Sequence, residues 1–201
     1  MAKVAKTRAR PRKMPTQERS RAMVSTILEA ATRVLMKEGY ARATTNRIAK
    51  AAGISVGSFY QYFPTKDAVV VALMRRHREK MRALLEAHVE RFRSAPLEEA
   101  VPALIAAVFA VHASNPKLHQ VMFEHVLRTD ARRELDEFEP WVERVVEEAL
   151  TLHKTRLRVT DTQAAAFVVV HLVTGVSRAA TGSGHENLEK ELTDAVLRYL
   201  L

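Results

Sequence analysis

The chain has 201 residues, of which 47% are hydrophobic and 27% charged, a composition typical of a globular protein with room for one domain or two small ones. It contains no cysteine, which excludes disulfides, thiol redox sensing and cysteine-based metal sites. No run of 18 uninterrupted apolar residues is present, and the basic N-terminus lacks the apolar core of a signal peptide. We therefore expect a cytoplasmic protein with no membrane partner.

Residues 1–16 form the first distinct segment, with six basic residues, two prolines and no acidic residue. Such a composition cannot bury enough apolar surface to fold alone, so we expect a disordered basic arm. Two interpretations stay open: a solvated tail, or an arm that contacts phosphates or the minor groove of DNA.

Residues 17–66 are predicted to form three helices. Apolar residues recur at helical spacing over 16–38, and Gly39 ends this first helix. A short helix then starts at Thr44 or Thr45, either of which can cap it, and turns Ile48 and Ala49 inward.

A tight turn and a second short helix follow. Gly53 supplies the backbone freedom that the turn needs, and Ser55 is the expected N-cap of the next helix. Phe59 and Phe63 are its expected buried anchors, and Pro64 ends it. The spacing predicts a helix-turn-helix whose second helix enters the major groove of DNA.

Charge supports this prediction. Residues 1–66 hold fourteen Lys or Arg and three Glu, a net charge of +11, whereas residues 67–201 hold eighteen basic and twenty acidic residues, a net charge of −2. All the excess positive charge therefore lies with the helix-turn-helix, as binding to a phosphate backbone requires.

Residues 18–66 resemble the DNA-binding domain of TetR family transcriptional regulators. The matching elements are Gly39-Tyr40, Thr44-Thr45, Ile48-Ala49, Gly53, Phe59-Tyr60, Phe63 and Lys66. The resemblance implies phosphate contacts from Tyr60 and Lys66. Base reading is expected from Ser58, Gln61 and Tyr62, with Val56 and Gly57 in close apolar approach. The complete predicted DNA-binding set is Thr45, Asn46, Arg47, Ser55, Val56, Gly57, Ser58, Tyr60, Gln61, Tyr62 and Lys66.

Residues 67–201 are predicted to be entirely helical, giving an all-α fold of about nine helices. A fourth helix over 66–93 is expected to join this domain to the first. Later helices are expected over 97–113, 115–127 and 130–153, with a kink or start at Pro102 and a kink at Pro140. Capping-box patterns at Thr160-x-x-Gln163 and Ser183-x-x-Glu186 predict the starts of the last two helices.

The segment 164–180 is apolar nearly all the way round, so it needs cover on more than one side. It is either the central helix of a monomer or part of a dimer interface. The TetR resemblance implies the dimer, in which the last two helices of each subunit form a four-helix bundle. The predicted interface residues are Ala165, Val168, Leu172, Gly175, Ala179, Leu192, Val196 and Leu200.

Large or polar residues on otherwise apolar faces suggest an effector pocket, which the resemblance also implies in the C-terminal domain. These residues are His77, Met81, Phe109, His112, Met122, Phe123, Trp141, His171 and Thr174. The alternative for each is a well-packed core position. The scattered histidines predict no metal site, and no motif for a cofactor or for catalysis is present.

Together these patterns predict a homodimeric repressor that binds a palindromic DNA operator and is released by a small, mostly apolar effector. Activation of transcription stays open, because promoter position decides the sign. The alternative from another class is an architectural DNA-binding protein without an effector, and an enzyme is not expected.

Overall fold

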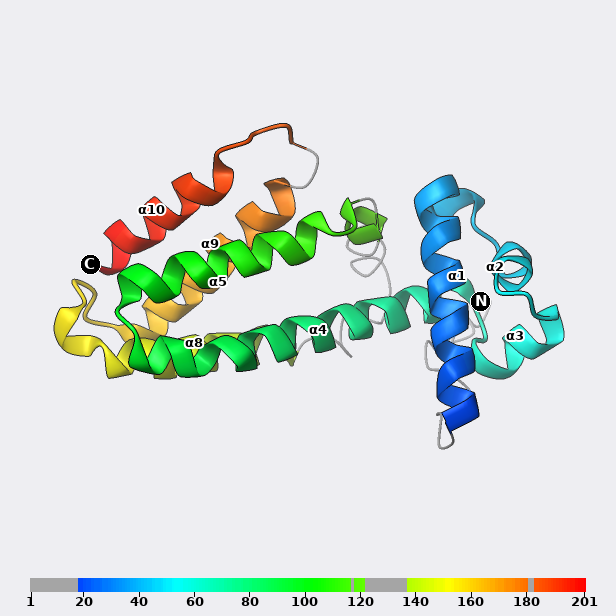
Figure 1. The fold of residues 1–201 in the computed structure, drawn as a ribbon, viewed down its shortest axis with the longest axis horizontal. Helices are drawn as coiled ribbons and strands as arrows, with labels where there is room; N and C mark the ends of the chain where they lie inside the picture. The colour runs from blue at the N-terminus through cyan, green and yellow to red at the C-terminus, as the bar shows by residue number, and fades with distance from the viewer. Residues whose placement is uncertain (1–17, 117, 122–136, 181–182) are drawn as a thin grey trace, which may run out of the picture. The chain divides into compact units, whose positions relative to one another are not determined.

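The computed structural model describes residues 18–116, 118–121, 137–180 and 183–201. Over these residues the chain is all-α, as predicted, and they include no strand (Figure 1). They divide into two compact units, one reaching Arg76 and including 118–121, the other made of 77–116 and 137–201. The helices are α1 (Glu18–Arg42), α2 (Thr45–Ala51), α3 (Val56–Tyr62), α4 (Lys66–Ser94), α5 (Leu97–Ala113), α8 (Phe138–Leu152), the 3-10 helix η1 (Lys154–Arg156), α9 (Thr162–Ala180) and α10 (Leu188–Leu200).

In the first unit α2 packs on α1, and α3 packs on α2. Gly39 has φ 72° and ψ 169°, so the regular part of α1 ends there even though helical hydrogen bonding resumes to Arg42. Ile27 of α1, Ile48 of α2 and Phe59 of α3 are each at most 1% exposed and form the core between the three helices. Burial of these side chains holds the outer face of α3 in a fixed orientation.

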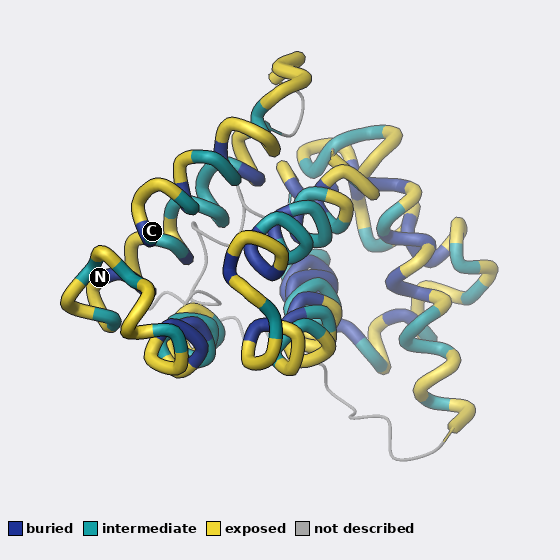
Figure 2. The backbone as a smooth tube through the Cα atoms, turned by 60° about the vertical axis from the view of Figure 1, so that its left-hand side comes forward, coloured by how far each residue is buried: buried dark blue, intermediate teal, exposed yellow. Residues whose placement is uncertain are grey.

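The second unit is a helical layer structure in which α8 packs on α9, and α10 packs on α5 and α9 (Figure 1). Its core joins residues of every one of these helices with Phe92 near the end of α4. Figure 2 shows buried segments where these helices face one another and exposed segments on their outer sides. The backbone N–H of Arg158 donates to the Leu200 carbonyl at 2.8 Å, which ties the end of α10 to the segment before α9.

Several predicted helix starts are corrected. Asp161, not Thr160, caps α9, because its Oδ1 accepts from the Ala164 N–H at 2.9 Å. The Ser183 box is wrong: Ser183 Oγ accepts from the backbone N–H of His185, and α10 begins only at Leu188. α8 begins at Phe138, so Pro140 lies in its first turn, where a missing N–H costs nothing.

Other predictions concern the middle of the chain. Pro102 lies inside a continuous α5 and does not mark its start. The predicted helix over 115–127 and the first residues of the one over 130–153 lie largely outside the described residues.

α9 is a long and strongly apolar helix. By length and composition it could cross a membrane, with a mean hydropathy of 1.3 over its window, of which 22% is buried. An expectation based only on uninterrupted apolar runs does not single out this helix. His171, Thr174 and Ser177 interrupt the apolar run, but the mean hydropathy of the helix stays high. The same low burial also fits a helix that packs on a partner.

Candidate nucleic-acid interface

The start of α3 is fixed by two serines. The Ser58 N–H donates to Ser55 Oγ at 3.0 Å, which confirms Ser55 as the N-cap, and the two hydroxyl oxygens lie 2.9 Å apart. Ser58 is half-buried as a result. Both serines therefore order the helix start, and the outward face of α3 is left to other residues.

That outward face consists of Val56, Gly57, Tyr60 and Gln61, which are all exposed. Val56 is 37% exposed and Tyr60 41% exposed although both are large and apolar or aromatic. Tyr62 is half-buried. A surface of small, apolar and amide groups is what close approach to base edges requires.

Gly57 is the closest-approach position on this face. A Cβ built there would meet only Ser55 Oγ, at 3.8 Å, which is ordinary contact. Its backbone φ does not demand glycine, in contrast to Gly53, whose φ of 69° lies in the left-handed region. The fold therefore needs glycine at 53 and not at 57.

A second polar group joins α2 to α3. Thr45 Oγ1 lies 3.0 Å from the Tyr60 hydroxyl, and Asn46 beside it is exposed. Hydroxyl and amide donors gathered next to the reading helix suit contacts with phosphate oxygens.

Two basic residues of the predicted set make polar contacts within their own chain. Arg47 forms an ion pair with Glu38, and its Nη1 also donates to the Arg42 carbonyl at 3.2 Å. Lys66 Nζ donates to the carbonyls of Tyr40 and Ala43 at 2.9 and 3.1 Å. Both side chains therefore have partners near the end of α1, and their roles as DNA contacts stay predictions.

The predicted effector residues are only partly brought together. The rings of His77 and His112 meet edge to face at 5.6 Å, and Met81 is 7% exposed. Phe109, Trp141 and Thr174 are half-buried on three different helices. Met122 and Phe123 lie outside the described residues.

His112 is the buried titratable group of this set, at 4% exposed. Its Nδ1 lies 3.0 Å from the Val108 carbonyl, one turn back on α5. Burial lowers the pKa of His112, and the charge of Arg178 lowers it further, whereas the Val108 hydrogen bond raises it. The neutral imidazole is therefore favoured at this position.

His171 is corrected as a pocket residue. It is exposed, stacks on Phe167 at 4.1 Å between ring centroids, and lies 3.8 Å from Glu143 of α8. These contacts place it on the outer face of α9.

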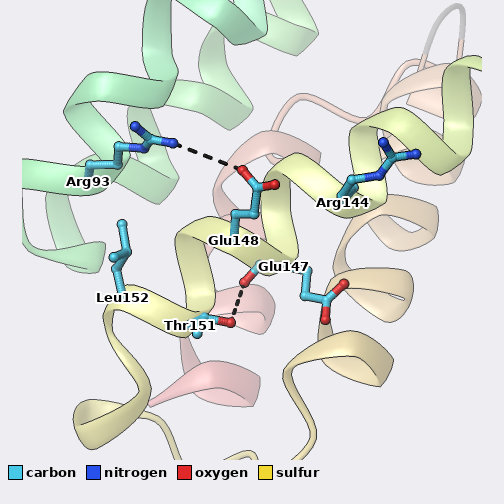
Figure 3. Close-up of a pocket in the computed structure, with 6 residues that line it drawn as sticks. All are labelled: Arg93, Arg144, Glu147, Glu148, Thr151 and Leu152. Carbon is cyan, nitrogen blue, oxygen red and sulfur yellow. Dashed lines mark hydrogen bonds and ion pairs between the residues drawn. The ribbon is translucent and has the colours of Figure 1, made fainter.

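A hollow of about 670 Å³ lies beside α8, and its lining is mostly charged (Figure 3). Arg93 at the end of α4 pairs with Glu148 at 4.0 Å across it, and Thr151 donates to the Glu147 carbonyl at 2.8 Å. None of the predicted effector residues lines this hollow.

Half of the predicted dimer residues are corrected. Ala165, Leu192, Val196 and Leu200 are at most 4% exposed and belong to the core of their own chain, so a partner cannot reach their side chains. Leu172 and Gly175 are half-buried, and Ala179 is exposed. The exposed apolar face of α9 instead centres on Phe167 and Val168, which are 53% and 41% exposed.

Phe167 was missed although it adjoins a predicted residue. The helical periodicity could have identified it, since residues 164, 167, 168, 171, 175 and 179 lie along one face of the helix.

Comparison with known proteins decides the family. Residues 27–73 match the bacterial regulatory proteins of the tetR family, and residues 96–200, more than half of the chain, match the tetracyclin repressor-like C-terminal domain. The chain belongs to the TetR family. The two matches fall on the helix-turn-helix and on the second helical unit, so this TetR family protein has the fold of a transcriptional repressor with both parts of that architecture.

Curated relatives match over part of their length. The nucleoid occlusion factor SlmA of Haemophilus ducreyi is 33% identical over 91 residues, covering 45% of this chain and 44% of that protein. The fatty acid metabolism regulator protein of Bacillus subtilis is 30% identical over 93 residues, or 46% of each chain. The chain thus matches less than half the length of these relatives.

Solved structures match over nearly the whole chain. The fatty acid degradation regulator FadR from Bacillus halodurans aligns with a TM-score of 0.69 and 24% identity, covering 92% of this chain and 96% of that one. FadR from Bacillus subtilis in complex with stearoyl-CoA aligns with a TM-score of 0.67 and 19% identity, covering 88% and 99%. These likenesses show the TetR fold over nearly the whole chain.

Proposed function

We propose that this TetR family protein is a homodimeric transcriptional repressor that reads a palindromic DNA operator with α3 and is released by a small, mostly apolar effector. The observation that carries the proposal is the α3 face: a helix capped by Ser55 and anchored by buried Phe59, with Gly57 and Gln61 exposed on its outer side. The net charge of +11 over residues 1–66 supports it by favouring approach to phosphate.

Base reading falls to Gln61, whose side-chain amide can make two hydrogen bonds to an adenine. Val56 and Gly57 approach the groove closely because neither carries a bulky polar group. Thr45, Asn46 and Tyr60 hydrogen bond phosphate oxygens and fix the register of α3.

Dimerisation uses the exposed stripe of α9 around Phe167, Val168 and Ala179. A helix this apolar and this exposed needs a partner, and a second copy also provides the second reading helix. Two such helices reach successive major grooves about 34–36 Å apart, which explains why the operator is palindromic.

The effector binds in the second unit, near the contact between His77 and His112. Two structural neighbours are described in complex with molecules that carry a large apolar part, FadR with stearoyl-CoA and SmeT with triclosan, which supports a mostly apolar effector here. The effector acts by preferring a conformation that fits DNA poorly, and a difference of about 1–3 kcal/mol is enough for regulation.

The alternative function is effector-independent coating of DNA by a cytoplasmic architectural protein. The similarity to the nucleoid occlusion factor SlmA is the observation that supports this alternative. Selection of bound fragments from sheared genomic DNA by the purified protein distinguishes the two. A short palindromic motif supports the repressor, and capture without a motif refutes it in favour of the architectural protein.

A further inference from the structure

Lys66 is the first residue of α4 and was expected to contact a DNA phosphate. Its ammonium has three N–H donors. Two of them are used by the carbonyls of Tyr40 and Ala43, at 2.9 and 3.1 Å. Nζ also lies 3.9 Å from the centroid of the Tyr40 ring, so the third donor faces an aromatic surface.

The two carbonyls are not ordinary acceptors. Tyr40 lies in the last turn of α1, after the break at Gly39, and Ala43 is the first residue beyond the end of that helix. An ammonium placed there satisfies them and interacts favourably with the helix end.

Tyr40 makes a second connection to the same place. Its hydroxyl donates to Oδ1 of Asp67, the residue that follows Lys66. The first turn of α4 therefore holds the end of α1 through two adjacent residues, one basic and one acidic, which both contact Tyr40.

This cluster lies directly before the proposed DNA-contacting residues. Thr44, the residue after Ala43, caps α2 by accepting from the Arg47 N–H at 3.2 Å. Thr45 then hydrogen bonds to Tyr60 of α3 at 3.0 Å. A continuous series of contacts thus runs from Lys66 through the Ala43 carbonyl to the start of α2 and on to Tyr60 in α3.

We infer that Lys66, together with Tyr40 and Asp67, is a positioning group that fixes α2 and α3 on the first turn of α4, and that Lys66 does not contact DNA. The inference deepens the proposed function and rests on it for the DNA readouts. It predicts that Lys66 affects binding only through the geometry of the helix-turn-helix.

Lysine accessibility tests the assignment without any operator. The protein is reductively methylated in a time course, alone and with a random 30-base-pair duplex, and each lysine is followed by mass spectrometry. We expect Lys66 to react about tenfold or more slowly than the exposed Lys50 in the free protein, with no further protection by DNA. Rapid labelling of free Lys66 that DNA suppresses would overturn the inference.

Salt dependence provides the second test. Lys66→Met should lower affinity roughly tenfold at fixed salt, since a charged hydrogen-bonded group is lost, while the slope of log K against log salt stays that of the wild type. A phosphate contact would instead reduce the slope by about one. The duplex carries the sequence that the wild-type protein selects, with the random duplex as control.

The Asp67→Asn variant distinguishes a positioning role of this cluster from a purely electrostatic effect on DNA binding. Removing a negative charge near DNA should tighten binding if only electrostatics matters, whereas loss of the Tyr40 connection should weaken it. Tyr40→Phe, a neutral change, should weaken binding in the same way and lower the melting temperature. Tighter binding by Asp67→Asn with no effect of Tyr40→Phe would overturn the inference. If no sequence is selected, the repressor proposal fails, and the labelling result still decides the role of Lys66.

Discussion

Phe167→Ala is the sharpest test of the proposed dimer. Phe167 is 53% exposed on the single chain, and a phenylalanine buries roughly 150–250 Å² when covered, so about 100 Å² awaits a partner. At about 25 cal/mol per Å² this amounts to about 2.5 kcal/mol. Because a two-fold interface contains Phe167 twice, the substitution should cost at most about 5 kcal/mol of dimerisation free energy. This corresponds to an increase in the dissociation constant of the dimer by up to three or four orders of magnitude.

The assay is sedimentation equilibrium over a wide concentration range, with circular dichroism to verify that the variant is folded. Met36→Ala is the matched control, because Met36 is a large apolar residue, 38% exposed, on α1 of the first unit, whereas the proposed interface belongs to the second. We expect the control to dimerise like the wild type. A dissociation constant for Phe167→Ala that also equals the wild-type value would refute an interface centred on this face.

Three further outcomes are expected. Gln61→Ala should cost about 1–3 kcal/mol on the selected operator and nothing on random DNA, by fluorescence anisotropy; equal losses on both would exclude base reading. Gly53→Ala should destabilise the fold by about 1 kcal/mol in urea denaturation because φ is 69°, whereas Gly57→Ala should not. Burial lowers the pKa of His112, so the unfolded chain takes up its proton first and the free energy of unfolding should fall as the pH drops below 6.5. In His112→Gln the free energy of unfolding should depend less on pH in this range, and a pH profile equal to that of the wild type would contradict the role given to His112.

The first unit could be predicted closely from local chemistry. Gly39 ends the regular part of α1, Thr44 and Ser55 cap the two short helices, and Phe59 is fully buried, as expected. Each of these features depends on residues within a few positions of one another, which is the range over which capping and periodicity act.

Other features could not be predicted because they depend on tertiary contacts. The periodicity of α10 places Leu192 and Val196 on its apolar face, but it does not tell whether that face packs on their own chain or on another. In the structure both side chains are buried in the core of their own chain. Lys66 looks like any basic residue beside a DNA-reading helix, and only the fold brings the Tyr40 carbonyl within 2.9 Å of it. Competing caps such as Thr160 and Asp161 differ by one residue, which pattern alone does not resolve.

The open space around Gly57 has a consequence for how such a protein acquires new targets. The residues that specify the fold of α3, above all Phe59, are buried, while positions 57 and 61 are exposed and support no other part of the structure. Side chains can therefore be exchanged at these two positions one at a time without lowering the stability of the fold. A small combinatorial library restricted to them should yield variants that keep the melting temperature and differ in the base pairs they prefer.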